Sequence, residues 1–235
     1  MSIFSRIKEK AKGVLGGIKD KAKKVFEKVK KRVIGTSLPK LPPGFRDELA
    51  ITNEAYVDAD SRKPTIMGWR YDRALSAKRH AVYVKQGSRE VMLGLRGTVP
   101  NLKNIRDLGS DALIGAEDTL RISPDAFKKS EYMKEARQAY KEVQRKYSGF
   151  DITIVGHSLG GRGALQLAKD KKDEAVIFNA GGGKFGNKNQ LPAGSVGFRA
   201  PTDPISAGFR SDKRTFSIVD ESKPKGVNHS LEYFM

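Results

Sequence analysis

The sequence predicts one α/β domain, a mostly parallel central sheet flanked by helices, preceded by an amphipathic helix. Three observations carry this prediction. From about residue 45 onward, short runs rich in β-branched residues alternate with helical stretches. One of these runs leads through a glycine-rich turn directly into a helix. The 235 residues suffice for one domain of ordinary size but not for two sizeable ones, and 38% are hydrophobic, which is enough for a core.

The first 35 residues show the pattern of a basic amphipathic helix. Residues 1–40 hold 13 of the 45 Lys and Arg residues and three of the 27 Asp and Glu residues, so more than half of the net charge of +18 lies there. Nine apolar residues span 29 positions in eight steps, a mean spacing of 3.6 that matches the α-helical period and forms one stripe. They are Phe4, Ile7, Ala11, Val14, Ile18, Ala22, Val25, Val29 and Val33.

Three features are predicted in the stretch that follows this arm. Residues 36–44 are rich in proline and are predicted to be a stiff linker, with the domain occupying residues 45–235. A helix is expected near residues 46–58. Two β-rich runs, His80–Lys85 and Val91–Leu95, surround a glycine-containing turn and predict a hairpin.

Helices and strands alternate in the second half of the chain. Pro124 stands at the first position of a helix that is predicted to run to about Lys146. Beyond it the pattern predicts four strands and one further helix, Arg162–Lys171. The strands are Asp151–Val155, Ala175–Phe178, Ser195–Arg199 and Thr215–Val219.

The strongest functional signal is the segment from Gly156 to Gly160, which reads Gly-His-Ser-Leu-Gly. The pattern Gly-x-Ser-x-Gly is weak evidence alone, but here it follows an apolar strand and precedes a helix, as a nucleophile elbow requires. Small residues permit the tight turn that raises a serine hydroxyl above the sheet, and the helix N-terminus favours developing negative charge. We therefore interpret Ser158 as a nucleophile. A phosphate-binding turn is the alternative, but such a turn needs no serine at its centre.

A serine nucleophile needs a base, and the sequence contains three histidines, His80, His157 and His229. In folds with a nucleophile elbow the chain order is serine, then acid, then histidine. Only His229 follows Ser158, so it is the predicted base. His157 lies inside the elbow, and His80 opens a predicted strand and is expected to be structural.

The acid should lie between Ser158 and His229, directly after a strand. Asp203 follows a predicted strand in a turn-like Thr-Asp-Pro, and Asp220 also follows one, so both remain candidates at this point. The acid would hold the histidine tautomer and stabilise the imidazolium. The other carboxylates in this interval are Asp170, Asp173, Glu174, Asp212 and Glu221.

The tetrahedral intermediate of ester hydrolysis needs backbone donors. The residue after the nucleophile, here Leu159, supplies one N–H, and a loop after an earlier strand supplies the second. The segment Leu95–Thr98 follows such a strand, so Thr98 is the candidate for the second donor and its hydroxyl could add another. The alternative is that this segment is a simple strand-ending turn.

Together these residues resemble the class 3 lipases, the fungal triacylglycerol-lipase-like branch of the α/β hydrolases. The elbow, Gly156–Gly161, is similar to the family's Gly-His-Ser-Leu-Gly-Gly at all six positions. The family's Phe-Arg-Gly-[Ser/Thr] segment and the Asp-containing stretch after it resemble Leu95–Thr98 and Asn104–Leu108. Its Asp-Pro acid and its histidine before Glu-Tyr-aromatic are similar to Asp203–Pro204 and His229–Phe234.

The resemblance covers roughly residues 45–235 and implies an α/β-hydrolase fold. It also implies hydrolysis of ester bonds in acylglycerols or phospholipids with no cofactor and no metal, and it favours Asp203 over Asp220 as the acid. The family's lid would correspond to residues 99–122. The basic arm is not part of the family pattern. The sequence has no cysteine, which excludes disulfides and cysteine-based zinc sites.

The arm predicts the partner and the location. A long aliphatic stripe bordered by lysines is typical of a helix that lies on anionic lipid, whereas nucleic acid is the alternative partner. Lysines interrupt every apolar stretch near the N-terminus, and no run approaches the roughly 18 apolar residues of a membrane span, so no secretory signal is predicted. A membrane-associated or cytoplasmic location is expected. A virus that breaches a host membrane would also suit this combination, which makes a place in the virion one hypothesis.

Three functions are compatible with these observations. The first is hydrolysis of lipid esters, of the lipase or phospholipase A type. The second is an esterase or thioesterase that acts on soluble substrates. The third is a membrane- or nucleic-acid-binding protein without activity on a hydrolase scaffold. The complete set of Ser158, Asp203 and His229 disfavours the third function, because a protein without activity does not need all three.

Overall fold

The computed structural model describes most of the chain beyond the arm. The predicted arm and the candidate lid, residues 99–122, lie outside the described residues, as does most of the glycine-rich stretch 181–186. The described segments are residues 37–98, 123–181, 190–203, 205–209, 212–223 and 228–235.

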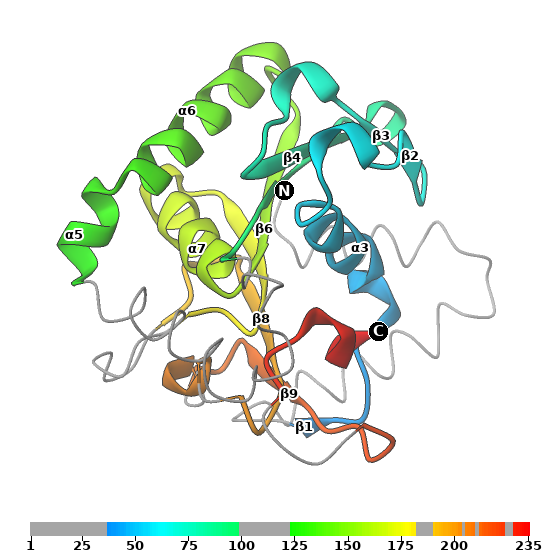
Figure 1. The fold of residues 1–235 in the computed structure, drawn as a ribbon, viewed down its shortest axis with the longest axis vertical. Coiled ribbons are helices and arrows are strands. Elements are labelled where there is room, and N and C mark those ends of the chain that lie inside the picture. Colours follow the sequence, from blue (N-terminus) through cyan, green and yellow to red (C-terminus); the bar gives the residue numbers. More distant parts are fainter. Residues whose placement is uncertain (1–36, 99–122, 182–189, 204, 210–211, 224–227) are drawn as a thin grey trace.

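These residues form a nine-stranded sheet in the order β1-β9-β8-β7-β6-β5-β4-β3-β2 (Figure 1). The six strands from β1 to β5 in this order pair in parallel, and β5, β4, β3 and β2 pair antiparallel. The predicted architecture, a mostly parallel sheet with flanking helices as in the α/β-hydrolase fold, is confirmed. The strands are β1 Ser37–Leu38, β2 Thr65–Ile66, β3 Trp69–Tyr71, β4 His80–Lys85, β5 Glu90–Leu95, β6 Asp151–His157, β7 Glu174–Phe178, β8 Val196–Arg199 and β9 Thr215–Ile218.

Helices cover both faces of the sheet. Figure 1 shows α5, α6 and α7 on one side of the strands and α3 on the other. Successive residues of a strand point to opposite faces. Leu93 and Ile154 therefore contribute to the core under α6 and α7, while Met92 and Val155 contribute to the core that includes α3. The helices are α3 Arg46–Glu54, α5 Pro124–Lys129, α6 Glu131–Lys146 and α7 Leu159–Lys171.

The hairpin is confirmed, and the long helix is corrected. Strands β4 and β5 pair over six residues on each side of the predicted turn. The single helix predicted from Pro124 to Lys146 is wrong, because Ser130 interrupts it in an extended conformation (φ −62°, ψ 153°). Its hydroxyl accepts a hydrogen bond from the backbone N–H of Met133 at 3.3 Å and so caps α6. Serine competes for backbone donors in this way, which favours a helix start over a helix interior.

The connection between the strand and the helix at the elbow is shorter than the sequence pattern predicted. Strand β6 continues through His157, and α7 begins at Leu159 rather than near Arg162, so Ser158 alone separates them. Two short antiparallel strands, β2 and β3, were not predicted, because runs of two and three residues are too short to show a period.

The stretch predicted to be a linker packs on the domain from residue 37 onward. Ser37 and Leu38 pair with Ser217 and Ile218 of β9, which adds an edge strand to the sheet. Leu41 is 7% exposed and lies in the core that includes α3. The pairing of β1 with β9 and the burial of Leu41 explain why this part of the Pro-rich stretch packs on the domain. No helix among the described residues has the length and apolar character that a bilayer crossing requires.

Candidate active site

Ser158 occupies a strained turn between β6 and α7. Its backbone has φ 58° and ψ −125°, a region that residues with side chains rarely adopt and that costs on the order of 1–3 kcal/mol. The turn is possible because Gly160 lies against β5: a Cβ added there would be 2.1 Å from the backbone oxygen of Leu95. Gly156 is equally confined, 2.4 Å from the Gly160 carbonyl carbon by the same measure. The glycines of the motif therefore permit the sharp strand-to-helix turn that a nucleophile elbow requires.

The structure brings the three predicted catalytic residues together. His229 Nε2 lies 2.8 Å from Ser158 Oγ, and His229 Nδ1 lies 3.0 Å from Asp203 Oδ1. Ser158 follows β6, Asp203 follows β8, and His229 lies close to the C-terminus, so residues from three separate parts of the chain converge. Asp220, the other candidate acid, is partly exposed and accepts hydrogen bonds from Ser222 instead.

Asp203 is built to remain ionised. Its side chain is fully buried, and it accepts backbone hydrogen bonds from Ile205 to Oδ1 and from Ser206 to Oδ2, both at 3.0 Å. Burial alone would raise the pKa of Asp203, but the hydrogen bond and charge of His229 and the donors at residues 205 and 206 hold it below its usual value. A carboxylate with this surrounding can orient the His229 ring and stabilise its positive form.

His157 lies within the site but is not free to act as a base. Its Nε2 lies 2.5 Å from the backbone oxygen of His229, and its Nδ1 lies 2.9 Å from the Tyr56 hydroxyl. The pKa of His157 is lowered to about 3, mainly by burial and to a lesser extent by the nearby His229 ring. The ring is therefore neutral near pH 7, and both nitrogens are occupied. His80, the remaining histidine, lies away from the site with Nε2 3.1 Å from the Leu75 carbonyl oxygen.

The predicted oxyanion segment lies beside the elbow. A Cβ added to Gly97 would be 3.3 Å from the Ser158 Cβ and 2.8 Å from the His157 carbonyl oxygen, so the chain passes directly over the nucleophile. Thr98 is the next residue and is exposed, and Leu159 opens α7 immediately after the serine. These placements suit the roles expected of Thr98 and Leu159, which remain predictions.

Two residues of the site were missed by the sequence analysis. Asn179, fully buried at the end of β7 with φ 41°, donates to the Asn228 carbonyl oxygen at 3.2 Å and accepts from Ala200 N at 2.8 Å. It thereby holds the backbone next to His229. An asparagine between a strand and a glycine run is a weak signal for such a residue, because asparagine tolerates positive φ. Tyr56, which follows α3, had no signal.

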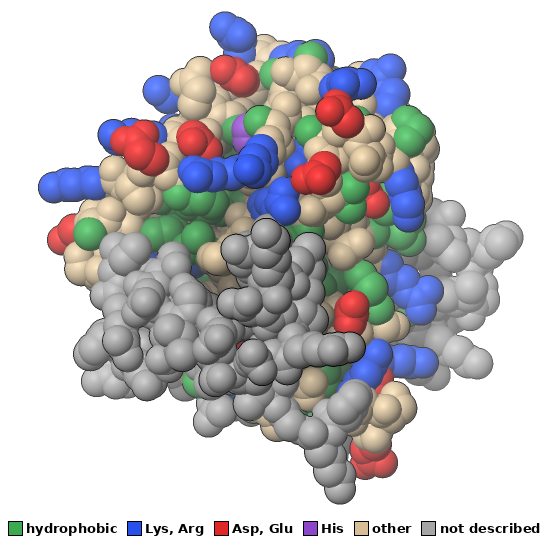
Figure 2. All heavy atoms as spheres, viewed as in Figure 1, with side chains coloured by type: hydrophobic (Ala, Val, Ile, Leu, Met, Phe, Trp, Pro, Cys, Tyr) green, Lys and Arg blue, Asp and Glu red, His purple; other side chains and the backbone are tan. Residues whose placement is uncertain are grey.

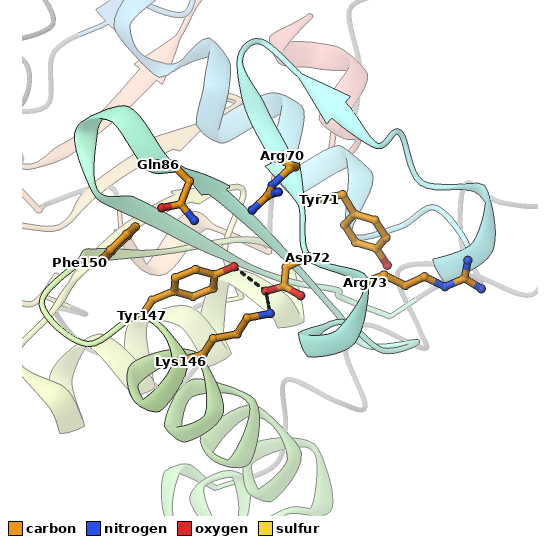
Figure 3. A pocket seen from close by; sticks show the side chains of 8 residues that line it. All are labelled: Arg70, Tyr71, Asp72, Arg73, Gln86, Lys146, Tyr147 and Phe150. Carbon is orange, nitrogen blue, oxygen red and sulfur yellow. Dashed lines mark hydrogen bonds and ion pairs between the residues drawn. The ribbon is translucent and has the colours of Figure 1, made fainter.

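A separate hollow of about 530 Å³ lies at the other end of the sheet (Figure 3). Phe150 in its wall directly precedes β6, whereas Ser158 directly follows that seven-residue strand, so they are separated by roughly 20 Å. Figure 3 shows Lys146 and Tyr147 pointing at Asp72, whose Oδ2 lies 2.6 Å from both the Lys146 Nζ and the Tyr147 hydroxyl. The hollow contains no nucleophile–base pair, so it is not the candidate active site.

No cluster of three or more His, Asp or Glu side chains suited to a metal ion occurs in the part of the chain that the structure describes. The groups in contact at the elbow are the hydroxyl of Ser158, the imidazole of His229 and the carboxylate of Asp203. The sheet order and these contacts define a protein of α/β-hydrolase fold with a Ser–His–Asp arrangement at its elbow.

Comparisons with known proteins gave distant structural neighbours. No protein-family model and no curated protein matches the chain. Among solved structures it is similar to the Lip2 lipase of Yarrowia lipolytica, with 15% identity over 69% of this chain and 73% of that one and a TM-score of 0.43. A Penicillium expansum triacylglycerol lipase has 15% identity over 78% and 80% (TM-score 0.42), and the Rhizomucor miehei lipase propeptide complex has 13% over 71% and 64% (TM-score 0.41). These neighbours are fungal lipases, and at such identities and TM-scores the likeness carries no conclusion about the activity of this chain.

Proposed function

We propose that this protein is a serine hydrolase that cleaves carboxylic esters in lipids through an acyl-enzyme. One observation carries the proposal: a continuous hydrogen-bonded line from Ser158 Oγ through both nitrogens of His229 to Asp203, with distances of 2.8 and 3.0 Å. The line starts at a serine in a strained turn, at the N-terminus of α7. Nucleophile, base and orienting acid are thereby in contact before any substrate binds.

The geometry implies the order of proton transfers. As Ser158 Oγ attacks the ester carbonyl, His229 Nε2 takes its proton, and the ionised Asp203 stabilises the imidazolium. His229 then returns the proton to the leaving alkoxide as the carbonyl–oxygen bond breaks, which leaves the acyl group on Ser158. Water repeats the sequence and releases the fatty acid. The N–H groups of Leu159 and Thr98 are proposed to bind the developing oxyanion, helped by the positive end of α7.

A lipid substrate is supported by the motifs around these residues and by the arm. The motifs resemble lipases, and residues 1–35 are proposed to lie on an anionic membrane through their apolar stripe and lysines. Each Lys or Arg near such a surface contributes on the order of 1 kcal/mol, and salt weakens that contribution. On the face in Figure 2, Lys and Arg of the described domain are interspersed with Asp and Glu, so that face does not suggest a second basic surface.

The arm also narrows the proposed substrate. An enzyme held on anionic lipid meets phospholipids first, so we favour a phospholipase A-type reaction over hydrolysis of neutral acylglycerols, with membrane disruption as its consequence. Membrane association is the proposed location.

The test is fatty-acid release from anionic phospholipid vesicles by the full chain and by Ser158→Ala. Ser88→Ala is a matched control, because Ser88 lies in the hairpin turn and its hydroxyl contacts Glu90. Release by the parent and Ser88→Ala but not by Ser158→Ala supports the proposal. Cleavage of a short soluble ester without fatty-acid release from vesicles would favour an esterase that acts on soluble substrates. Absence of cleavage with both substrates would reject the proposal that the protein is an ester hydrolase.

A further inference from the structure

Two tyrosines hold one peptide group of the oxyanion segment from both ends. The Tyr132 hydroxyl donates to the Arg96 carbonyl oxygen at 3.0 Å, and Gly97 N–H donates to the Tyr56 hydroxyl at 3.1 Å. This carbonyl and this N–H belong to the same peptide bond, which is planar, so the two contacts set its orientation. The peptide immediately after it carries the N–H of Thr98.

Glycine is required for this contact. A Cβ added to Gly97 would lie 2.3 Å from the Tyr56 oxygen, a distance that no relaxed side chain tolerates. Tyr56 therefore sets how closely the oxyanion segment approaches the elbow. Burial raises the pKa of Tyr56 well above its usual value, so the hydroxyl keeps its proton and can donate while it accepts from Gly97.

The same hydroxyl reaches the base through His157. The His229 carbonyl oxygen can only accept, so His157 Nε2, 2.5 Å away, carries the proton. In a neutral imidazole Nδ1 is then an acceptor, and the Tyr56 hydroxyl donates to it at 2.9 Å rather than to the His157 carbonyl oxygen at 3.3 Å. The line Gly97 N–H, Tyr56 O–H, His157 and His229 C=O thus pairs every donor with an acceptor.

The neutrality of His157 matters to the base beside it. The rings of His157 and His229 are 4.8 Å apart between centroids. A positive charge on His157 would oppose the imidazolium that forms on His229 during the reaction. A neutral donor holds the His229 backbone without that repulsion.

We propose that Tyr56 and His157 are positioning residues that couple the oxyanion segment to the catalytic base. Tyr56 holds the Arg96–Gly97 peptide and, through His157, the carbonyl of His229, so the oxyanion donor and the base are set against Ser158 by one hydrogen-bonded line. The inference rests on the proposed function, in which His229 is the base and Thr98 contributes a donor. Neither positioning residue touches the reacting atoms.

The kinetic test compares tyrosine-to-phenylalanine changes, each of which removes one hydroxyl. Tyr56→Phe releases the oxyanion segment and the base together and is expected to lower kcat about tenfold to a hundredfold, with KM within about twofold, because misplacement by about 1 Å costs on that order. Tyr132→Phe releases only the segment, so a smaller loss is expected. Tyr147→Phe, in the remote hollow of Figure 3, keeps the parent kcat.

The second readout is the Nδ1 proton of His229, followed by proton NMR in a chain with three histidines. Loss of the carbonyl contact lets the ring withdraw from Asp203, so Tyr56→Phe and His157→Asn are expected to shift the resonance of this proton upfield, whereas Tyr132→Phe leaves it unchanged. His157→Gln can place an amide donor where Nε2 stands and should keep the parent resonance position. Nitrogen shifts of the parent should show His157 as the neutral Nε2–H tautomer.

The outcomes separate this inference from the proposed function. Tyr56→Phe with parental kcat and an unmoved Nδ1 proton resonance of His229 would overturn the coupling, and so would a parent His157 that carries its proton on Nδ1. If the parent hydrolyses no ester, the proposed function fails. The NMR readout still decides whether Tyr56 and His157 position His229, because it needs no turnover.

Discussion

Replacement of Asp203 by asparagine should disable the base while leaving the fold intact. The carboxylate is fully buried, with Oδ1 accepting from His229 and from Ile205 N and with Oδ2 accepting from Ser206 N. An amide has one oxygen, so one of these two positions must become an NH₂. In either position the NH₂ faces a backbone N–H, that of Ser206 or that of Ile205, so two donors meet in a buried site at about 1–3 kcal/mol.

With the NH₂ toward Ser206, the amide oxygen keeps its contact with Nδ1, but the negative charge that stabilises the imidazolium is lost. The other arrangement turns the NH₂ toward His229 and Ile205. The NH₂ then donates to Nδ1, which moves the ring proton to Nε2 and removes the lone pair that must accept the proton of Ser158. A tautomer error of this kind lowers kcat by about 10⁴, equivalent to roughly 5.5 kcal/mol in the activation barrier. Asp203→Asn should therefore be nearly inactive and yet folded.

The assay is initial-rate hydrolysis of a short soluble ester, together with the midpoint of thermal unfolding. Asp220→Asn is the matched control, because Asp220 also follows a strand but is partly exposed and contacts Ser222 rather than His229. Its kcat should stay within about twofold of the parent. The reasoning is refuted if Asp203→Asn keeps more than about a tenth of the parent rate, or if Asp220→Asn is the more damaging change.

Three further predictions follow from the same contacts. Burial and the neighbouring His229 lower the pKa of His157 from 6.5 to about 3. Between these two pH values the folded state therefore binds fewer protons than the unfolded state. As the pH falls below 6.5, the free energy of unfolding should decrease by about 1.4 kcal/mol per pH unit. Urea unfolding at pH 7, 6 and 5 measures this slope, and an equal slope in His157→Gln would contradict it. Gly160→Ala should destabilise the protein by about 1–3 kcal/mol and abolish activity, since its Cβ would meet the backbone oxygen of Leu95; Gly44→Ala, with nothing within 4 Å, is the control in thermal unfolding. Removal of residues 1–35 ends before β1 and should abolish sedimentation with anionic vesicles but retain turnover of a soluble ester, and vesicle binding that survives the truncation would show that the arm is not the membrane anchor.

Local signals were sufficient where one short segment specifies its own geometry. The strand, the turn and the helix around Ser158 are adjacent in sequence, so spacing and residue size predict the elbow. The hairpin of β4 and β5 was predictable for the same reason. Serine at residue 130 is a similarly local signal, but its capping role competes with a strong helical pattern, and the pattern alone predicted one helix.

The sequence by itself determined which residues are the candidate nucleophile and the candidate base. Ser158 stands in a motif that needs small neighbours, and His229 is the one histidine that follows it. For the acid, the residues favoured Asp203, in a turn-like Thr-Asp-Pro after a strand, and left Asp220 as the second candidate because it also follows a strand. The resemblance to lipases strengthened the choice of Asp203.

Tertiary structure decided what depends on which strand ends meet. Asp203 touches His229 because its backbone turn is buried against the elbow, whereas the turn of Asp220 faces solvent. Tyr56, Tyr132 and Asn179 act through single hydroxyl and amide groups that reach backbone atoms far away in sequence. Such contacts leave no period or motif, since they depend on how α3, α6 and β7 pack around the sheet, and the chain shows them only when it is folded.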